Sequence, residues 1–220
     1  MMIPKCFRVL LSLVLVAEMS TAAAAAAAAT DEGFYVGMAY GQSQYEMNED
    51  LDIFDIQTSQ GQDDSDTALS IFMGYRANRY FRMEASYVDL GAATVYATGT
   101  FTSLTPQPIT GRFEGEIASK GAAFSVLGSI PVKNLAFYGR IGLFMAHTDL
   151  TGTVSSGPLS GSDTTSASTT AIIFGVGAGY TFLNHFYVNV EYTQYPKLGD
   201  EMKTGERDVS GLTVGLAYRY

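Results

Sequence analysis

The last twelve residues, 209–220, constrain the fold most strongly. From position 211 onward, apolar or aromatic residues alternate strictly with small or polar ones: Leu212, Val214, Leu216, Tyr218 and Tyr220 against Gly211, Thr213, Gly215, Ala217 and Arg219. Successive side chains of a strand point to opposite faces, so this period predicts a strand with one apolar face. Two tyrosines lie at the end of that face, and aromatic side chains gather where a membrane meets water. The pattern therefore favours a β-barrel in lipid over a soluble sheet.

Seven earlier segments show the same alternation. In each, apolar residues recur two positions apart on one face, as Phe34 and Val36 do. The alternation is least clear in the fourth segment, where we predict that Phe124, Val126 and Ile130 face outward. The chain thus has eight predicted strands, at 33–41, 67–76, 80–90, 117–130, 135–148, 170–182, 186–195 and 209–220.

The connections between these strands alternate between short and long. The short ones are 77–79, 131–134 and 183–185, and the long ones are 42–66, 91–116, 149–169 and 196–208. Strands of this length cross a bilayer when tilted, and a sheet in lipid must close because an open edge leaves polar backbone unpaired. Short turns on one side and long loops on the other are typical of bacterial outer-membrane barrels. We predict an all-β fold: an eight-stranded antiparallel transmembrane β-barrel with short periplasmic turns, periplasmic termini and long extracellular loops.

The start of the chain has the organisation of a secretory signal. Lys5 and Arg8 form a basic beginning, residues 9–17 form an apolar core, and the alanine run that follows offers small-residue cleavage sites. A membrane anchor is the weaker alternative, because a spanning helix needs about 20 apolar residues. We therefore predict a cleaved signal peptide at 1–29 and one barrel domain at 30–220.

The rest of the chain is acidic and contains no cysteine, since Cys6 lies in the predicted signal. Removing Lys5, Arg8 and Glu18 with the signal leaves 11 basic and 21 acidic residues, a formal net charge of −10. Phosphate binding needs a basic surface, so the composition argues against a nucleic-acid partner. Disulfides and thiol chemistry are not expected.

Three charged residues occupy inward positions at a similar depth: Glu84, Arg140 and Glu191, on the third, fifth and seventh predicted strands. The interior of an eight-stranded barrel is only just wide enough for side chains, so a buried charge there must be paired. We predict that Arg140 bridges the two glutamates. The network is then either a structural plug, which we favour, or the gate of a narrow ion pore that opens when the pairs exchange.

Other inward positions have simpler interpretations. Arg76, Arg82 and Arg219 lie near the periplasmic rim, where we expect water to solvate them. Glycines alternate on the inward face of the sixth strand, at Gly175, Gly177 and Gly179. No helix follows them, as a dinucleotide-binding loop would require, so we predict close packing opposite large side chains and no cofactor.

The first long loop is strongly acidic and has no lysine or arginine. Its acidic residues are Glu46, Glu49, Asp50, Asp52, Asp55, Asp63, Asp64 and Asp66. Their spacing does not match a calcium-binding loop, and no metal site is predicted. The loop is either a solvated, self-repelling surface or a region that contacts divalent cations at the lipopolysaccharide surface.

The second and third long loops differ in pattern. Residues 91–116 keep the strand alternation around a turn at 105–108, which indicates a hairpin raised above the membrane. Its exposed edge suits a partner that binds by adding a strand. Residues 151–170 are rich in Ser, Thr and Gly, and we predict a flexible surface loop.

The sequence does not indicate an enzyme. His185 falls in a periplasmic turn, and His147 shares the outward parity of the strand that carries it. Asp149 is near His147, but no nucleophile within reach of this pair can be identified from the sequence. No catalytic residue is therefore predicted.

The predicted signal, the rhythm of eight strands and four loops, and the terminal L-T-V-G-L-A-Y-R-Y resemble the eight-stranded outer-membrane barrels. This group contains the OmpA transmembrane domain and the OmpX, NspA and opacity-type proteins, and the resemblance covers the whole mature chain. It implies that Tyr218 and Tyr220 form a signal read by the outer-membrane assembly machinery. It also implies a luminal ion-pair network, which members of the group are known for.

Taken together, these features predict a non-enzymatic monomer of the outer membrane without a cofactor. It would contact outer-membrane lipid, lipopolysaccharide and a host or cell-surface ligand, and would stabilise the envelope. The alternative is a narrow ion-conducting porin gated by Glu84, Arg140 and Glu191.

Overall fold

A computed structural model describes residues 32–46, 56–101, 109–156, 159–183, 185–199 and 206–220. The predicted signal peptide, 1–29, lies outside these residues. Within them the chain forms nine strands: β1 (Gly33–Tyr45), β2 (Ile56–Asp63), β3 (Ser65–Arg76), β4 (Phe81–Phe101), β5 (Ile109–Val132), β6 (Leu135–Ser156), β7 (Leu159–Phe182), β8 (Phe186–Leu198) and β9 (Arg207–Arg219). None of the described residues belongs to a helix that is long and apolar enough to cross a membrane.

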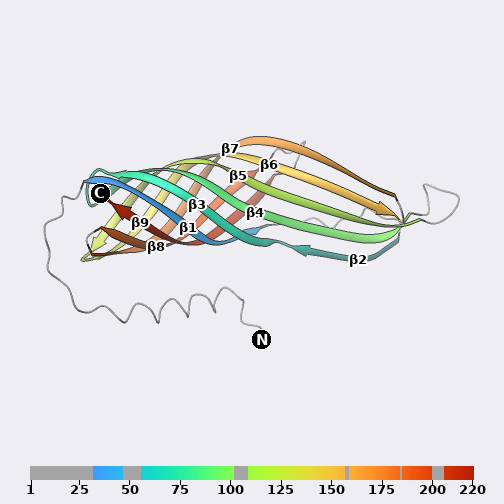
Figure 1. Ribbon diagram of the computed structural model, residues 1–220, viewed down its shortest axis with the longest axis horizontal. Coiled ribbons are helices and arrows are strands. Elements are labelled where there is room, and N and C mark those ends of the chain that lie inside the picture. The colour runs from blue at the N-terminus through green and yellow to red at the C-terminus, as the bar shows by residue number, and fades with distance from the viewer. Residues whose placement is uncertain (1–31, 47–55, 102–108, 157–158, 184, 200–205) are drawn as a thin grey trace, which may run out of the picture. The chain divides into compact units, whose positions relative to one another are not determined.

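Eight of these strands close into an antiparallel barrel (Figure 1). The order around the wall is β4, β3, β1, β9, β8, β7, β6 and β5, and a further ladder between β4 and β5 joins the two ends. The first and last barrel strands pair from Tyr35 opposite Arg219 to Tyr45 opposite Val209. Every strand of the wall therefore has a neighbour on both sides, as lipid requires. The predicted eight-stranded barrel is confirmed.

The outward faces agree with the predicted alternation. Phe34 and Val36 are exposed on the wall. Phe124, Val126 and Ile130 are exposed as well, which confirms the orientation predicted for the fourth barrel strand. The wall thus presents apolar side chains to the surrounding lipid.

The short turns, the start of β1 and the end of β9 lie at the same rim of the barrel. The backbone N–H of Arg219 donates to the carbonyl of His185 at 2.7 Å, and that of Tyr220 donates to Phe34 at 3.1 Å. The turn between β7 and β8 therefore adjoins the start of β1 and the end of β9. Short turns mark the periplasmic side of an outer-membrane barrel, so we refer to this end as the periplasmic rim.

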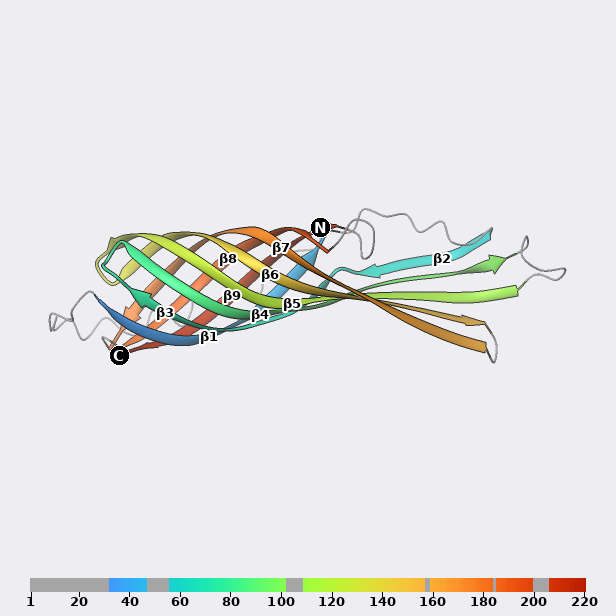
Figure 2. The ribbon, with the colours of Figure 1, turned by 90° about the horizontal axis from the view of Figure 1, so that it is seen from above.

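At the opposite end, β4 to β7 continue well past β1, β8 and β9 (Figure 2). These four strands have 21 to 24 residues, whereas β1, β8 and β9 have 13 each. A register shift between Asp89 and Ala92 of β4 marks the point where its extension begins. Beyond it, β4 and β5 stay paired as far as Phe101 opposite Ile109, which confirms the raised strands predicted for 91–116, while the predicted turn at 105–108 lies outside the described residues. The exposed edge predicted for this hairpin is wrong, because β2 pairs with β4 on one side and β6 pairs with β5 on the other.

The prediction that 151–170 is a flexible loop is wrong. β6 and β7 remain paired through this region as far as Ser156 opposite Leu159. Threonine favours strands, and hydroxyl groups bond across the two strands, as between Thr151 and Thr164 at 3.1 Å. Low hydrophobicity here reflects the absence of lipid at this height rather than the absence of a strand.

The first long loop also contains a strand, which the sequence did not reveal. β2 pairs with the extension of β4 from Ile56 opposite Thr100 to Asp63 opposite Thr94. Together with the extensions it forms a five-stranded surface outside the membrane. We call this surface the extracellular sheet: β2 with residues 92–101, 109–118, 149–156 and 159–166 of β4 to β7.

The outer half of the barrel interior is filled by apolar side chains. Phe144 and Tyr195 pack edge to face there, with their ring centroids 5.2 Å apart. We call this cluster the apolar layer: Tyr45, Val88, Leu90, Ala93, Ile117, Ala123, Phe144, Ala146, Ala171, Ile173, Tyr195, Leu198 and Val209.

Glycines of β7 make room for large side chains in the inner half, as predicted. A Cβ atom at Gly177 would lie 2.5 Å from the Tyr138 ring and 2.8 Å from the carbonyl oxygen of Val190. At Gly179 it would lie 2.0 Å from the Tyr187 hydroxyl. Even one methyl group at these positions would therefore displace a tyrosine that fills the lumen.

This packing yields a test of the fold. Gly177→Ala should lower the free energy of unfolding by about 1–3 kcal/mol, because the methyl group overpacks the lumen against backbone and ring. Urea unfolding of the refolded barrel in lipid vesicles measures the change. Gly128→Ala is the matched control, since no atom lies within 4 Å of its Cβ position, and it should cause no loss. Equal stability of both variants would contradict the packing.

Candidate functional site

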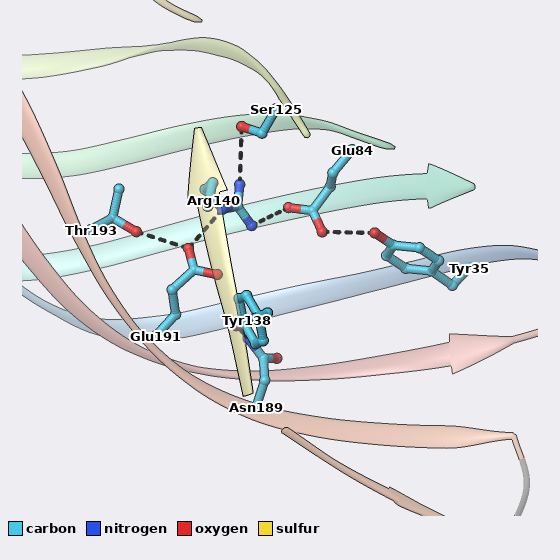
Figure 3. A network of polar contacts seen from close by, with 8 residues as sticks. All are labelled: Tyr35, Glu84, Ser125, Tyr138, Arg140, Asn189, Glu191 and Thr193. Carbon is cyan, nitrogen blue, oxygen red and sulfur yellow. Dashed lines mark hydrogen bonds and ion pairs between the residues drawn. The ribbon is translucent and has the colours of Figure 1, made fainter. Parts of the chain in front are cut away.

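Glu84 on β4, Arg140 on β6 and Glu191 on β8 come together in the barrel interior (Figure 3). The Nη2 atom of Arg140 forms an ion pair with Oε1 of Glu84. Its Nε atom lies 2.9 Å from Oε1 of Glu191. All three side chains are at least nine-tenths buried, so the guanidinium bridges two carboxylates away from bulk water.

Three uncharged side chains complete this arrangement. The Tyr35 hydroxyl donates to Oε2 of Glu84 at 3.0 Å, and the Thr193 hydroxyl donates to Oε1 of Glu191 at 2.8 Å. Nη1 of Arg140 donates to the Ser125 hydroxyl at 3.4 Å. These bonds partly replace the water that buried charges lose. We call the whole set the luminal network: Tyr35, Glu84, Ser125, Arg140, Glu191 and Thr193.

Sequence reasoning missed Tyr35, Ser125 and Thr193 as members of the network. Each is a polar residue at an inward position of its strand, and this feature of the sequence could have identified it as a member of the network. Ser125 stands directly opposite Glu84 in the ladder between β4 and β5. Their joint role depends on strand register, which alternation within a single strand does not specify.

The burial of Arg82 contradicts one of the sequence predictions. This residue was expected to be solvated, but it is only 9 % exposed. Its guanidinium carbon lies 4.7 Å from the ring centroid of Tyr138 and 5.1 Å from that of Tyr187. These tyrosines come from β6 and β8 and cover the arginine from across the lumen. Arg76 and Arg219, nearer the rim, are partly exposed.

The space around the network is small. A cavity of about 40 Å³ lies among its side chains, and a water molecule needs about 10–15 Å³ of such volume. The apolar layer lies on the extracellular side of the network. Ion passage would therefore require both an exchange of charge pairs and an opening of the apolar layer.

The acidic residues of the first long connection divide into two groups. Glu49, Asp50, Asp52 and Asp55 lie outside the described residues. Glu46 is exposed, Asp63 ends β2, and Asp64 lies between β2 and β3. The carboxylate of Asp66 accepts the backbone N–H groups of Thr67 at 2.6 Å and Ala92 at 2.8 Å. Asp66 therefore fixes the base of the extracellular sheet.

Within the described ranges, no three histidine, cysteine, aspartate or glutamate side chains are grouped so that they could hold a metal ion.

His147 lies on the outer face of β6, opposite Ser168 of β7. Its Nδ1 atom is 3.1 Å from the Ser168 hydroxyl, and its Nε2 atom is 3.3 Å from Oδ1 of Asp149. A hydroxyl thus lies within reach of the His–Asp pair, which the sequence did not reveal. All three residues remain open to solvent, and this surface is rich in similar cross-strand bonds, such as that from Ser166 to Asp149 at 2.6 Å.

The terminal tyrosines form an aromatic group at the periplasmic rim. The rings of Tyr218 and Tyr220 are 5.3 Å apart, and Tyr218 also stacks on His185 and meets Phe186 edge to face. This position agrees with the aromatic level of a membrane interface. Their role as an assembly signal stays a prediction.

Solved structures of other small outer-membrane proteins resemble this chain at low sequence identity. Ail of Yersinia pestis, solved with the heparin analogue sucrose octasulfate, is 14% identical, with 87% of this chain and 100% of Ail covered and a TM-score of 0.43. Neisserial surface protein A is 16% identical, with 86% of this chain and 97% of that protein covered and a TM-score of 0.45. OprG of Pseudomonas aeruginosa is 12% identical, with 87% of this chain and 97% of OprG covered and a TM-score of 0.46. A search of curated proteins found no match.

The family comparison covers nearly the whole chain. Residues 29–220 match the sequence profile of the OmpA-like transmembrane domain. This match includes all nine strands of the barrel and the extracellular sheet. The chain therefore belongs to the OmpA-like transmembrane domain family and is a β-barrel of the bacterial outer membrane.

Proposed function

We propose that this chain is a non-enzymatic surface protein that stabilises the envelope and binds a ligand outside the cell. The extracellular sheet is the observation that carries the proposal. A strand that serves only to cross the membrane needs about 9–11 residues, and β1, β8 and β9, with 13 residues each, are close to that length. The extensions of β4 to β7 instead hold a paired surface in place above the barrel (Figure 2).

Two edges of the extracellular sheet support binding by strand addition. Among the described strands, β7 pairs with β8 only from Phe174 onward, and β2 pairs with β4 alone. Residues 159–168 of β7 therefore have a strand neighbour on one side only. An open edge offers backbone donors and acceptors to an extended segment of a partner. The only charge in this stretch is that of Asp163, so little repels an incoming strand.

Acidic side chains on the extracellular sheet support a second kind of contact. Glu114, Glu116 and Asp163 are exposed, and Glu114 pairs with Arg112 at 3.3 Å. Divalent cations prefer oxygen ligands, so exposed carboxylates suit cation bridges to the phosphate groups of lipopolysaccharide. Such bridges would link the protein to its neighbours in the outer leaflet and so stabilise the envelope.

Shortening the sheet tests this proposal. Deleting 151–154 and 161–164 removes four opposed pairs and keeps both the turn and the parity of the strands. Cells carrying this variant should lose attachment to host cells and become more sensitive to a chelator, while the barrel still folds. The readouts are counts of attached cells, survival in EDTA and the heat-dependent gel shift of the folded barrel. The control is Thr153→Ala, which leaves the sheet intact. Wild-type attachment and EDTA survival in the shortened variant would contradict the proposal.

For the luminal network we propose the role of a plug. Both glutamates are held by Arg140 and by a hydroxyl donor, and the apolar layer covers this arrangement on the extracellular side. A gate would need the apolar layer to open as well as an exchange of charge pairs. The small cavity and the apolar layer give little support to that alternative.

Removing Arg140 tests the importance of the charge pairs. Arg140→Ala leaves two buried carboxylates without their base, so the free energy of unfolding should fall by about 3–5 kcal/mol in urea titrations. Arg112→Ala breaks an exposed pair and should cost about 0–1 kcal/mol. Replacing Glu84 and Glu191 by Gln in the Arg140→Ala background should restore part of the loss. Equal stability of the two arginine variants would contradict the pairing.

Single-channel recording separates plug from pore. In planar bilayers, the wild-type barrel should show no discrete current steps, because charge pairs and the apolar layer close the lumen. Combining Arg140→Ala with Phe144→Ala should produce steps, since it weakens both layers. Discrete steps in the wild type that Arg140→Ala alone enlarges would instead support the gated pore.

A further inference from the structure

A second cavity, of about 70 Å³, opens at the periplasmic rim. We call it the rim cavity. Five basic side chains from β3, β4, β9 and two of the turns line it: Arg76, Arg79, Arg82, Lys133 and Arg219. None of the residues lining it carries a side-chain carboxylate. In a protein with an acidic formal charge, this concentration of positive charge points to a negatively charged ligand.

Arg82 is the innermost of these side chains, and it lines both the rim cavity and the cavity of the luminal network. It is nine-tenths buried, yet its Nε and Nη2 atoms have no hydrogen-bond partner among the described residues. The faces of Tyr138 and Tyr187 stabilise the positive charge but cannot accept hydrogen bonds in the plane of the guanidinium. Buried donors without acceptors are costly, so the site is poised for an acceptor.

The luminal network does not supply this acceptor. Arg140 contacts Oε1 of Glu84 and Oε1 of Glu191, and Oε2 of Glu191 makes no hydrogen bond to Arg82 or to any other described residue. Nε and Nη2 of Arg82 therefore remain without a hydrogen-bond partner among the described residues.

We propose that the rim cavity binds one phosphate-type oxyanion, which enters from the periplasm and meets the guanidinium of Arg82. Planar guanidinium groups match the oxygens of a phosphate through pairs of N–H bonds. Since one water needs about 10–15 Å³ by this measure, the rim cavity has room for a tetrahedral anion. Two sources present the same chemistry at this height: free phosphate in the periplasm and the headgroup of an inner-leaflet phospholipid.

Inorganic phosphate is the first probe. The refolded mature barrel is held in an uncharged detergent at constant ionic strength, and its thermal unfolding is followed while phosphate replaces chloride. Saturable stabilisation by phosphate is the expected result. The absence of any difference between phosphate and chloride, in detergent and in the vesicles described below, would overturn the proposal.

Charge-neutral variants locate the site. Arg82→Gln should abolish the phosphate effect, and Lys133→Gln and Arg79→Gln at the exposed rim should each weaken the apparent affinity several-fold. The two rim variants keep the test valid if Arg82→Gln does not refold. Arg112→Gln removes the same charge from the extracellular sheet and should leave the affinity unchanged. Equal affinities in Lys133→Gln, Arg79→Gln and Arg112→Gln would overturn the proposal.

Lipid vesicles distinguish the two sources. The barrel is refolded in vesicles of phosphatidylcholine alone or with phosphatidylglycerol, and native mass spectrometry records the adducts released with it. Retention of phosphatidylglycerol that Lys133→Gln and Arg79→Gln reduce identifies the lipid headgroup as the ligand. Saturable stabilisation by added phosphate in both vesicles, without lipid retention, identifies the free anion.

Discussion

Closure of the backbone hydrogen-bond ladder is the constraint on which the rest of this structure depends. Inside a bilayer each unpaired N–H or carbonyl group costs several kcal/mol, so β1 and β9 must pair along the seam from Tyr35 to Tyr45. Closure sends alternate side chains outward into lipid and inward into a narrow lumen. Every charge that reaches the inside must therefore find its partner within one small volume.

The lumen meets this requirement by placing charged side chains and apolar side chains at different heights along the barrel axis. The luminal network places two carboxylates and one guanidinium in the inner half, whereas the outer half holds the rings of Phe144 and Tyr195 in an apolar layer. Glycines of β7 make this filling feasible, because Gly177 and Gly179 leave space for the Tyr138 and Tyr187 rings. The glycines of β7 and the large side chains opposite them thus fill the lumen together.

Alternation alone was enough to predict the barrel, the outward faces and the inward positions of Glu84, Arg140 and Glu191, because lipid on one side enforces period 2. The same signal failed in two segments that lie outside the lipid. Residues 159–169 form a strand through pairing with β6, and β2 forms through pairing with β4, although neither has a continuous apolar face. The burial of Arg82 depends on Tyr138 and Tyr187 from two other strands, a contact that no single segment contains.

The unequal strand lengths have a consequence for the distance at which the protein can act. Residues 159–173 of β7 lie beyond its last pair with β8. Of these, residues 159–166 belong to the extracellular sheet, and at about 3.3 Å per residue they span roughly 26 Å, several times the roughly 5–8 Å of one headgroup region. A partner too bulky to approach the bilayer can still reach the tip. Because the tip is carried by paired strands, capture would not first require a long loop to lose conformational entropy.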